Sequence, residues 1–439
     1  MLIQFSVQNY KTFKEQNTIS LVASYDKELS HNKFSTKFDV EVLKSAVIYG
    51  ANASGKTKFV EALAFMKYFV LNSAIYTQKG DSIPIEPFQL NTESIHEPSR
   101  FEIIFSYKEV LYRYGYEVSR SEVVSEWLYY KPNVREVELF FRDRQTFTTH
   151  KNYFKQGKIL IDKKMVRNNA LLISAAAQFN DKISIQVIEW FRNLKVLEGL
   201  ESRKYQGETM SMINGDAKKT VLKALEAADL GIEDLKLVEM GLEELPESVK
   251  NEITTQMNKD REGKFKIFSD VSTVRKVYDK NKKEVSITNL SMESDESAGT
   301  QKYFALIGPI LEALKNGNTL VIDELDSNLH PILMCNIISL FNSEVTNRNN
   351  AQLIFNTHDT SLISSERNLF RRDQIWFVQK DLFGEAKLYS LADFKTDTVR
   401  KEDDFEFKYL LGKFGGVPYT INFETTIASL LWGDDEKKK

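Results

Sequence analysis

The sequence predicts an α/β fold in which a mixed sheet carries a glycine-rich loop, with an antiparallel β part and a helical insert beside it. Three observations favour this class. A buried-strand pattern leads into a phosphate-binding glycine pattern and then a helical pattern at Val47–Met66, VIYGANASGKTKFVEALAFM. A second apolar strand ends in acidic residues within Thr319–Pro331, TLVIDELDSNLHP. Between them, Phe101–Tyr130 alternates apolar and polar residues, which is typical of an antiparallel sheet.

The glycine pattern has the spacing of a phosphate-binding loop, or P-loop. The apolar, β-branched run Val42–Tyr49 before it predicts a buried parallel strand. Glycines let such a loop wrap closely around phosphates, so that backbone N–H groups and the helix N-terminus face the negative charge. We therefore predict an ATP site with Lys56 against the β- and γ-phosphates and Thr57 on Mg²⁺. The predicted nucleotide contacts are Gly50, Asn52, Ser54, Gly55, Lys56 and Thr57. The structural alternative is a glycine-rich turn before an ordinary helix.

Composition bounds the class of protein. Of the 439 residues, 42% are hydrophobic and 28% are charged, which is ordinary for a soluble globular protein with a sizeable core. No apolar run is long enough to predict a membrane span, and no secretory signal is evident. A single cysteine, Cys335, cannot form an internal disulfide, which fits a reducing compartment. We therefore expect a cytoplasmic protein with no membrane partner. The net charge of −3 gives no global basic field, so nucleic acid stays open as a partner only through local patches.

The acidic strand supplies what a P-loop needs to complete an Mg²⁺ site. Leu320–Ile322 predicts a buried strand that delivers Asp323 and Glu324 at its carboxyl end, where ligands bind in open α/β sheets. Asp323 suits Mg²⁺, a hard ion that prefers carboxylate oxygen and retained waters. Glu324 suits the role of general base toward an attacking water.

A capped helix start is the alternative explanation of these acids. Asp326, Ser327 and Asn328 are good capping residues, and we expect a helix to begin near Asn328 with Pro331 in its first turn. Both interpretations can hold at once.

Two further segments belong to the same edge. Small residues, Ser297 to Gly299, precede a helical pattern and leave its positive end open to an anion. The predicted strand Leu353–Phe355 would place Thr357 and His358 at the sheet edge on the phosphate side.

These four motifs, in this order, resemble those of ABC-type ATPase heads in the branch of the SMC-like and OLD-like ATPases. The opening LIQFSVQNYKTF is similar to the first strand of that family. Three closing segments, Arg372–Asp381, Leu388–Phe394 and Tyr409–Pro418, are similar to stand-alone bacterial members, the abortive-infection and other anti-phage ATPases of the RloA/AbiL-like group. The implied fold is an ABC-ATPase head: a mixed sheet with a P-loop and an antiparallel β subdomain.

The resemblance implies roles for individual residues. Ser297 and Gly299 fall in the signature motif, which in that family binds the γ-phosphate of ATP held by the opposing subunit; Ala298 and Glu296 depart from its usual form. The resemblance also implies roles for three residues outside the signature motif. The loop that crosses the dimer interface corresponds to Asp326, the switch histidine to His358, and the Q-loop residue near Mg²⁺ to Gln89. The implied assembly is a homodimer or higher homo-oligomer through ATP-sandwich heads.

The expected organisation divides the chain into five parts. They are a P-loop part of lobe I at 1–100, its antiparallel β part at 101–157, a helical insert at 158–265, a lobe II with the signature, acidic strand and switch histidine at 266–395, and a C-terminal segment and tail at 396–439.

We expect an ATP-binding and ATP-hydrolysing protein that uses Mg²⁺. The resemblance implies a sensor or regulatory subunit of an anti-phage system that controls a separate nuclease or toxin, because the chain after His358 is too short for the nuclease domain of OLD-like enzymes. The alternatives are a DNA-repair or chromosome ATPase that acts directly on DNA and, less favoured, a transporter subunit. The insert is the leading candidate for contact with a partner, against the simpler hypothesis that it only covers the head.

Overall fold

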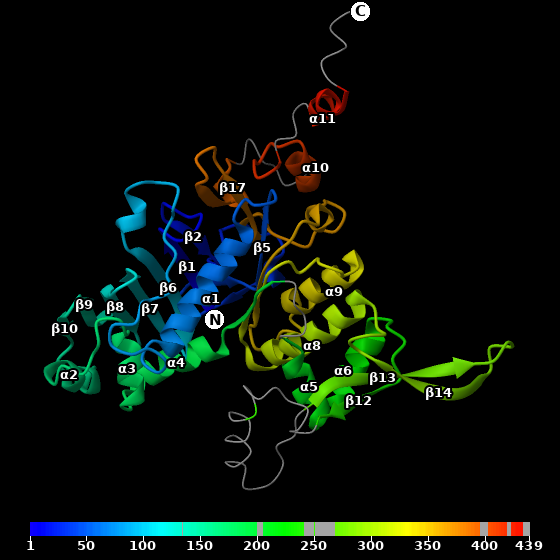
Figure 1. The fold of residues 1–439 in the computed structure, drawn as a ribbon, viewed down its shortest axis with the longest axis horizontal. Helices are drawn as coiled ribbons and strands as arrows, with labels where there is room; N and C mark the ends of the chain where they lie inside the picture. The colour runs from blue at the N-terminus through cyan, green and yellow to red at the C-terminus, as the bar shows by residue number, and fades with distance from the viewer. Residues whose placement is uncertain are drawn as a thin grey trace, which may run out of the picture.

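The computed structural model describes residues 1–133, 135–199, 205–240, 250, 268–395, 403–418 and 423–432. Strands in these residues form sheets of seven, six, three and two strands, and helices cover them (Figure 1). The predicted α/β class is therefore confirmed.

The six-stranded sheet is the parallel sheet that carries the P-loop. Its order is β11 (Lys195–Leu197), β15 (Thr319–Ile322), β16 (Gln352–Asn356), β5 (Ser45–Gly50), β17 (Ile375–Lys380) and β18 (Ala386–Ser390). All neighbours pair in parallel except β17 with β18. The parallel strands therefore end at one edge, which brings the residues that follow β5, β15 and β16 together. The expected single strand Val42–Tyr49 is interrupted at Lys44, because β4 (Glu41–Leu43) pairs with β3 (Lys33–Ser35) instead.

The seven-stranded sheet is antiparallel throughout. It runs in the order β10 (Thr146–Thr149), β9 (Val137–Asp143), β8 (Val123–Lys131), β7 (Val110–Val118), β6 (Ser99–Tyr107), β1 (Leu2–Gln8) and β2 (Asn17–Ser20). The first of the strands predicted at Phe101–Tyr130, β6, thus pairs with the opening strand of the chain.

Helix α1 (Lys56–Asn72) lies between the two large sheets (Figure 1). Its aromatic side chains meet those of the antiparallel sheet, with ring centroids 5.4 Å apart for Phe59 and Phe5 and 5.3 Å apart for Phe65 and Phe101. Successive residues of β5 face opposite sides of their sheet, as in any strand. Ile48 therefore joins the core around α1, whereas Tyr49 joins the second core.

The second core lies under α8 (Ala298–Asn316) and α9 (Pro331–Asn342). Helix α9 begins at Pro331, not near Asn328, and its N-cap is His330, whose Nδ1 accepts the N–H of Ile332 at 3.2 Å. Asn328 instead has a φ of +61°, which a continuing right-handed helix does not allow.

The range 158–265 does not form one helical body within its described residues. Its first helices, α2 (Lys155–Asp162), α3 (Leu172–Gln178) and α4 (Lys182–Asn193), belong to the core around α1. Glu126 on β8 fixes the start of α3, since its carboxylate accepts the N–H groups of Leu172 and Ile173 at 2.7 and 3.0 Å. Strand β11 then joins the parallel sheet.

The rest of this range packs on the other side of the parallel sheet. Helices α5 (Gln206–Asn214) and α6 (Lys218–Ala227) contribute Ile213, Val221 and Leu225 to the core under α8. Strand β12 (Asp234–Glu239) pairs with β13 (Phe268–Tyr278), which pairs with β14 (Glu284–Ser291) in a ribbon that projects from the body (Figure 1). Residues 200–204, 241–249 and 251–265 of the expected insert lie outside the described part.

Short helices complete the structure. They are η1 (Ser30–Asn32), η2 (Ser94–His96), η5 (Thr360–Ile363), η6 (Arg372–Gln374), η7 (Leu391–Asp393), α10 (Phe405–Leu410) and α11 (Phe423–Trp432). No helix in the described ranges is both long and apolar enough to cross a membrane.

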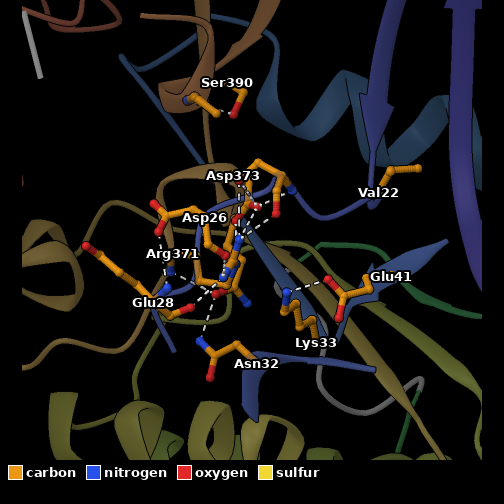
Figure 2. A network of polar contacts seen from close by, with 12 residues as sticks. Val22, Asp26, Glu28, Asn32, Lys33, Glu41, Arg371, Asp373 and Ser390 are labelled. Carbon is orange, nitrogen blue, oxygen red and sulfur yellow. Dashed lines mark hydrogen bonds and ion pairs between the residues drawn. The ribbon is translucent and has the colours of Figure 1, made fainter. Parts of the chain in front are cut away.

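A buried arginine fastens the strand beside the P-loop to the N-terminal part of the chain (Figure 2). Arg371, just before β17, donates to the carbonyl oxygen of Asp26 at 2.9 Å and to that of Glu28, and its guanidinium pairs with Asp373 at 2.8 Å. Asp373 also accepts the N–H of Ser24 at 2.7 Å. These bonds tie the segment before β17 to residues 24–28 of the N-terminal part of the chain.

Candidate nucleotide-binding site

The P-loop has the strand, loop and helix context that the sequence predicts. The fully buried β5 ends at Gly50, and α1 begins at Lys56. A side chain at Gly50 has no room, because an added Cβ would lie 2.5 Å from both Ser54 Oγ and the Val378 carbonyl oxygen. Gly55 has a φ of +118°, a conformation open to glycine. The glycines therefore fix the path of the loop.

The loop offers hydrogen-bond donors that the described chain does not use. The N–H groups of Gly55, Lys56 and Thr57 make no hydrogen bond to described residues, as expected for the first turn of a helix. The buried Ser54 Oγ has no partner either, whereas Asn52 is exposed. Such an array of open donors at a helix start fits an anion.

The loop also holds a buried cation. Lys56 exposes 6% of its surface, and its Nζ donates to the carbonyl oxygens of Gly50 and Ala51 at 2.8 and 3.1 Å. Burial lowers the pKa of Lys56 to about 8, although the charges of nearby carboxylates oppose the shift. These carboxylates are Asp326, Glu324 and Asp323.

The acidic residues follow β15, two strands away from β5 in the same parallel sheet. Asp323 is buried, and its Oδ1 accepts a hydrogen bond from Asn356 Nδ2. The Oδ1 of Asn356 accepts the N–H of Glu324 at 2.6 Å. Asn356, at the end of β16, thus holds both acidic residues. Glu324 has a φ of +52°, an uncommon conformation for a residue with a side chain.

Thr57 and Asp323 line one cavity of about 530 Å³, so two of the three residues predicted at the Mg²⁺ site face a shared space. Glu86 and Glu61 line the same cavity, as does Lys11, which lies 2.5 Å from Glu61. Carboxylates with a hydroxyl are oxygen donors that Mg²⁺ accepts. Among the described residues, no group of three or more His, Cys, Asp or Glu side chains forms a metal site on its own.

The predicted Q-loop residue is not part of this cavity. Gln89 is exposed and does not line it. Glu86, three residues earlier in the same loop, does.

His358 and Asp326 are adjacent. The backbone N–H of His358 donates to Asp326 Oδ2 at 3.0 Å, and the buried Asp326 Oδ1 has no hydrogen-bond partner among the described residues. Partial burial and the charge of Lys56 lower the pKa of His358 below its ordinary value.

Ser297 and Gly299 lie at the start of α8. Ser297 is its N-cap, and the Oγ accepts the N–H of Thr300 at 3.2 Å. A Cβ added at Gly299 would lie 2.7 Å from the carbonyl oxygen of Asn328, so the helix start touches the loop that follows the acidic pair. Ser297 and Ala298 are exposed.

Comparison with known families agrees with this geometry. Residues 45–364 match the family described as "AAA domain, putative AbiEii toxin, Type IV TA system". This range is well over half of the chain and includes the P-loop, the acidic pair and His358. The chain belongs to this AAA family. A search of curated proteins found no match. Among solved structures, this AAA-family chain is similar to the SMC head domain from Thermotoga maritima, with a TM-score of 0.39 and 12% identity over 89% of this chain and 98% of that chain.

Two residues of this site in the AAA-family chain, Asn356 and Glu86, were not predicted from the sequence. Asn356 was visible only as a polar residue at the end of an apolar strand, LIFN. Its role depends on the pairing of β16 with β15, which brings its amide to Asp323. Glu86 had no local signal, because its position depends on how the loop after α1 folds back against Thr57.

Proposed function

We propose that this AAA-family protein binds ATP with Mg²⁺ and hydrolyses it slowly. The observation that carries this proposal is that Thr57 of the P-loop and Asp323 after β15 line one cavity at the sheet edge, next to the buried Lys56. The open N–H groups and Lys56 would bind the phosphates, while Thr57 and Asp323 would hold Mg²⁺, which when bound neutralises phosphate charge. Glu324 would accept a proton from water in line with the γ-phosphate.

The decisive experiment uses Glu324→Gln. The variant keeps the shape of the side chain but cannot accept the proton, so we expect kcat to fall by about 10²- to 10⁴-fold with ATP affinity retained. Steady-state ATPase assays and equilibrium ATP binding measure the two quantities. Turnover equal to that of the wild type would remove Glu324 from this role.

We further propose that two copies sandwich two ATP molecules, with Ser297–Gly299 of each copy facing the nucleotide of the other. The exposure of Ser297 and Ala298 at the start of α8 supports this proposal. Asp326 and His358 would then lie at the same interface. ATP that binds the pair better than the single chain would favour the pair. Mass photometry of Glu324→Gln with and without ATP measures the fraction of paired chains. A monomer in both conditions would contradict the ATP sandwich.

For the biological role, we propose a regulatory subunit of a bacterial anti-phage system of the RloA/AbiL-like kind that controls a separate nuclease or toxin. The family description, which names a toxin and a type IV toxin–antitoxin system, supports this context. Direct action on DNA is the competing hypothesis. It requires phosphate contacts, and therefore DNA binding that weakens steeply with salt. Titration of the purified protein with duplex DNA at two salt concentrations distinguishes the two roles.

A further inference from the structure

One buried charge beside the candidate site has no role in the proposed chemistry. Lys302 lies in the second turn of α8 and exposes 5% of its surface. Its Nζ donates to the carbonyl oxygen of Glu324 at 3.4 Å. Burying an ammonium costs free energy unless acceptors and opposite charges compensate. For Lys302, the compensating groups all belong to the acidic loop, namely Glu324, Asp323 and Asp326.

The residue that Lys302 touches has a conformation that needs support. A positive φ at a residue with a side chain persists only where its surroundings hold it. Glu324 is held from both sides. Its N–H donates to Asn356 Oδ1 at 2.6 Å. Its carbonyl oxygen accepts the N–H of Ser327 at 3.2 Å, Ser327 Oγ at 2.9 Å and Lys302 Nζ. The direction of the Glu324 side chain therefore depends on these contacts.

A second contact joins the same helix to the same loop. At the start of α8, Gly299 approaches Asn328 so closely that a methyl group would lie 2.7 Å from the Asn328 carbonyl oxygen. Lys302 lies about one turn further along and reaches the other end of the loop, at Glu324. Two contacts one turn apart tie the helix start to the loop and restrict their independent movement.

We propose that Lys302 is a positioning residue that couples the start of α8 to Glu324. The inference rests on the proposed function, in which Glu324 is the general base. A ligand or partner that contacts Ser297–Gly299 would then act on the base through Lys302, in the same chain. Hydrolysis thereby becomes sensitive to what occupies the start of α8.

The kinetic test compares Lys302→Gln with Lys302→Arg. Glutamine removes the charge and shortens the side chain, so the Glu324 carbonyl loses a donor and the base is misplaced; a shift near 1 Å costs about 10²-fold in kcat. The P-loop contacts are untouched, so the KM for ATP stays unchanged. Arginine keeps a charged donor and restores most of the turnover. Lys315→Gln, at the exposed end of the same helix, is the control and keeps wild-type rates.

Wild-type turnover in Lys302→Gln would overturn the proposal, and so would equal losses of kcat and ATP binding in both Lys302 variants. If Lys302→Gln does not fold, Ser327→Ala removes another donor to the same carbonyl oxygen. It should lower kcat, by less than the lysine change, without altering KM. A normal kcat in folded Ser327→Ala would then count against the clamp, by which we mean the hold that Lys302 and Ser327 exert on the Glu324 carbonyl oxygen.

Hydrogen–deuterium exchange separates this proposal from the proposed function. Without nucleotide, the peptide 323–329 should exchange faster in Lys302→Gln than in the wild type and Lys302→Arg, because the clamp on Glu324 is weakened. Equal exchange in all three proteins would refute the clamp even if ATP is hydrolysed. Faster exchange in Lys302→Gln alone, in a protein without ATPase activity, would support the clamp and reject the function.

Discussion

The starts of α1 and α8 each carry a buried lysine that interacts electrostatically with the same three carboxylates. The two helix starts are nevertheless built differently. Burial lowers the pKa of both Lys56 and Lys302, and Asp323, Glu324 and Asp326 act on both. The start of α1 has Gly55 as N-cap and no side-chain cap. The start of α8 has Ser297, whose Oγ caps Thr300.

The difference separates two tasks. At α1, the first N–H groups bond to no described residue, and within the described part of the chain the lysine donates to carbonyl oxygens of its own loop, so an anion can replace those contacts at little cost. At α8, the cap and the contact of Gly299 with Asn328 fill the first turn, and the lysine holds the acidic loop. The start of α1 is suited to bind a nucleotide within its own chain. The start of α8 is tied to the acidic loop and, in the proposed sandwich, presents the exposed Ser297 and Ala298 to the nucleotide of the other copy.

The largest effect that tests this comparison is expected at α1. Lys56→Met should weaken ATP binding by about 10²-fold, because it removes a charge-assisted hydrogen bond to phosphate. Equilibrium binding of ATP with Mg²⁺ measures the loss. Lys58→Met is the matched control, since Lys58 is more exposed and pairs with Glu61 at 2.7 Å on the helix surface. If both changes have equal effects, Lys56 has no special contact with the nucleotide.

The next effect is expected at the contact between α8 and the acidic loop. Gly299→Ala should destabilise the protein by about 1–3 kcal/mol, because the added methyl group has to displace the backbone of Asn328. Gly207→Ala in α5 has open space around the new Cβ and should be neutral or stabilising by about 0.5–1 kcal/mol. Denaturant unfolding compares the two variants. Equal stability would mean that the helix start and the loop are not in tight contact.

The same contrast explains what the sequence could predict. The P-loop is a local pattern of strand, glycines and helix, so the sequence was enough to predict it. The order of the motifs along the chain was enough to predict that Asp323 and Glu324 follow a strand of the same sheet. Asn356 and Lys302 depend on pairing between segments far apart in sequence, and their neighbours along the chain give no sign of it. His330 replaced the predicted caps of α9 because Asn328 turns left-handed where the loop meets Gly299.

The range 158–265 shows the same limit on a larger scale. Its helical periodicity predicted the described helices, but it was wrong at Asp234–Glu239, which forms strand β12. Periodicity also does not say which sheet a helix covers. The buried Glu126 draws α3 to the antiparallel sheet, whereas the apolar faces of α5 and α6 pack under α8. The C-terminal helices expose large apolar side chains, including Phe407, Leu410 and Leu430. The sequence pattern favoured only the insert as a partner surface and did not predict the exposure of these side chains.

A smaller effect is expected from the cap of α8. Ser297→Ala should cost about 1 kcal/mol of stability, because the N–H of Thr300 loses its acceptor. Thermal unfolding measures this, with Ser294→Ala as the control, since the Ser294 backbone N–H, not its side chain, makes the bond to Ser291. In the proposed sandwich, Ser297→Ala also lowers ATP turnover. A stability loss without any change in turnover would leave Ser297 as a cap and remove it from the nucleotide contacts.

The smallest effect concerns the electrostatic link between the P-loop and His358. Burial first, and then the charge of Lys56, lower the pKa of His358, while Asp326, Glu324 and Asp323 raise it. A group whose pKa is lowered on folding stays neutral until the pH falls below its ordinary value, so the ring should take up its proton only under acidic conditions. NMR titration of the imidazole, assigned with His358→Asn, should give a pKa below 6.5 in the wild type. In Lys56→Met the pKa should rise, because a repelling charge is gone and the carboxylates remain. An unchanged pKa in that variant would show that Lys56 and His358 do not share one electrostatic site, and the meeting of these motifs at the sheet edge would then lack its simplest physical consequence.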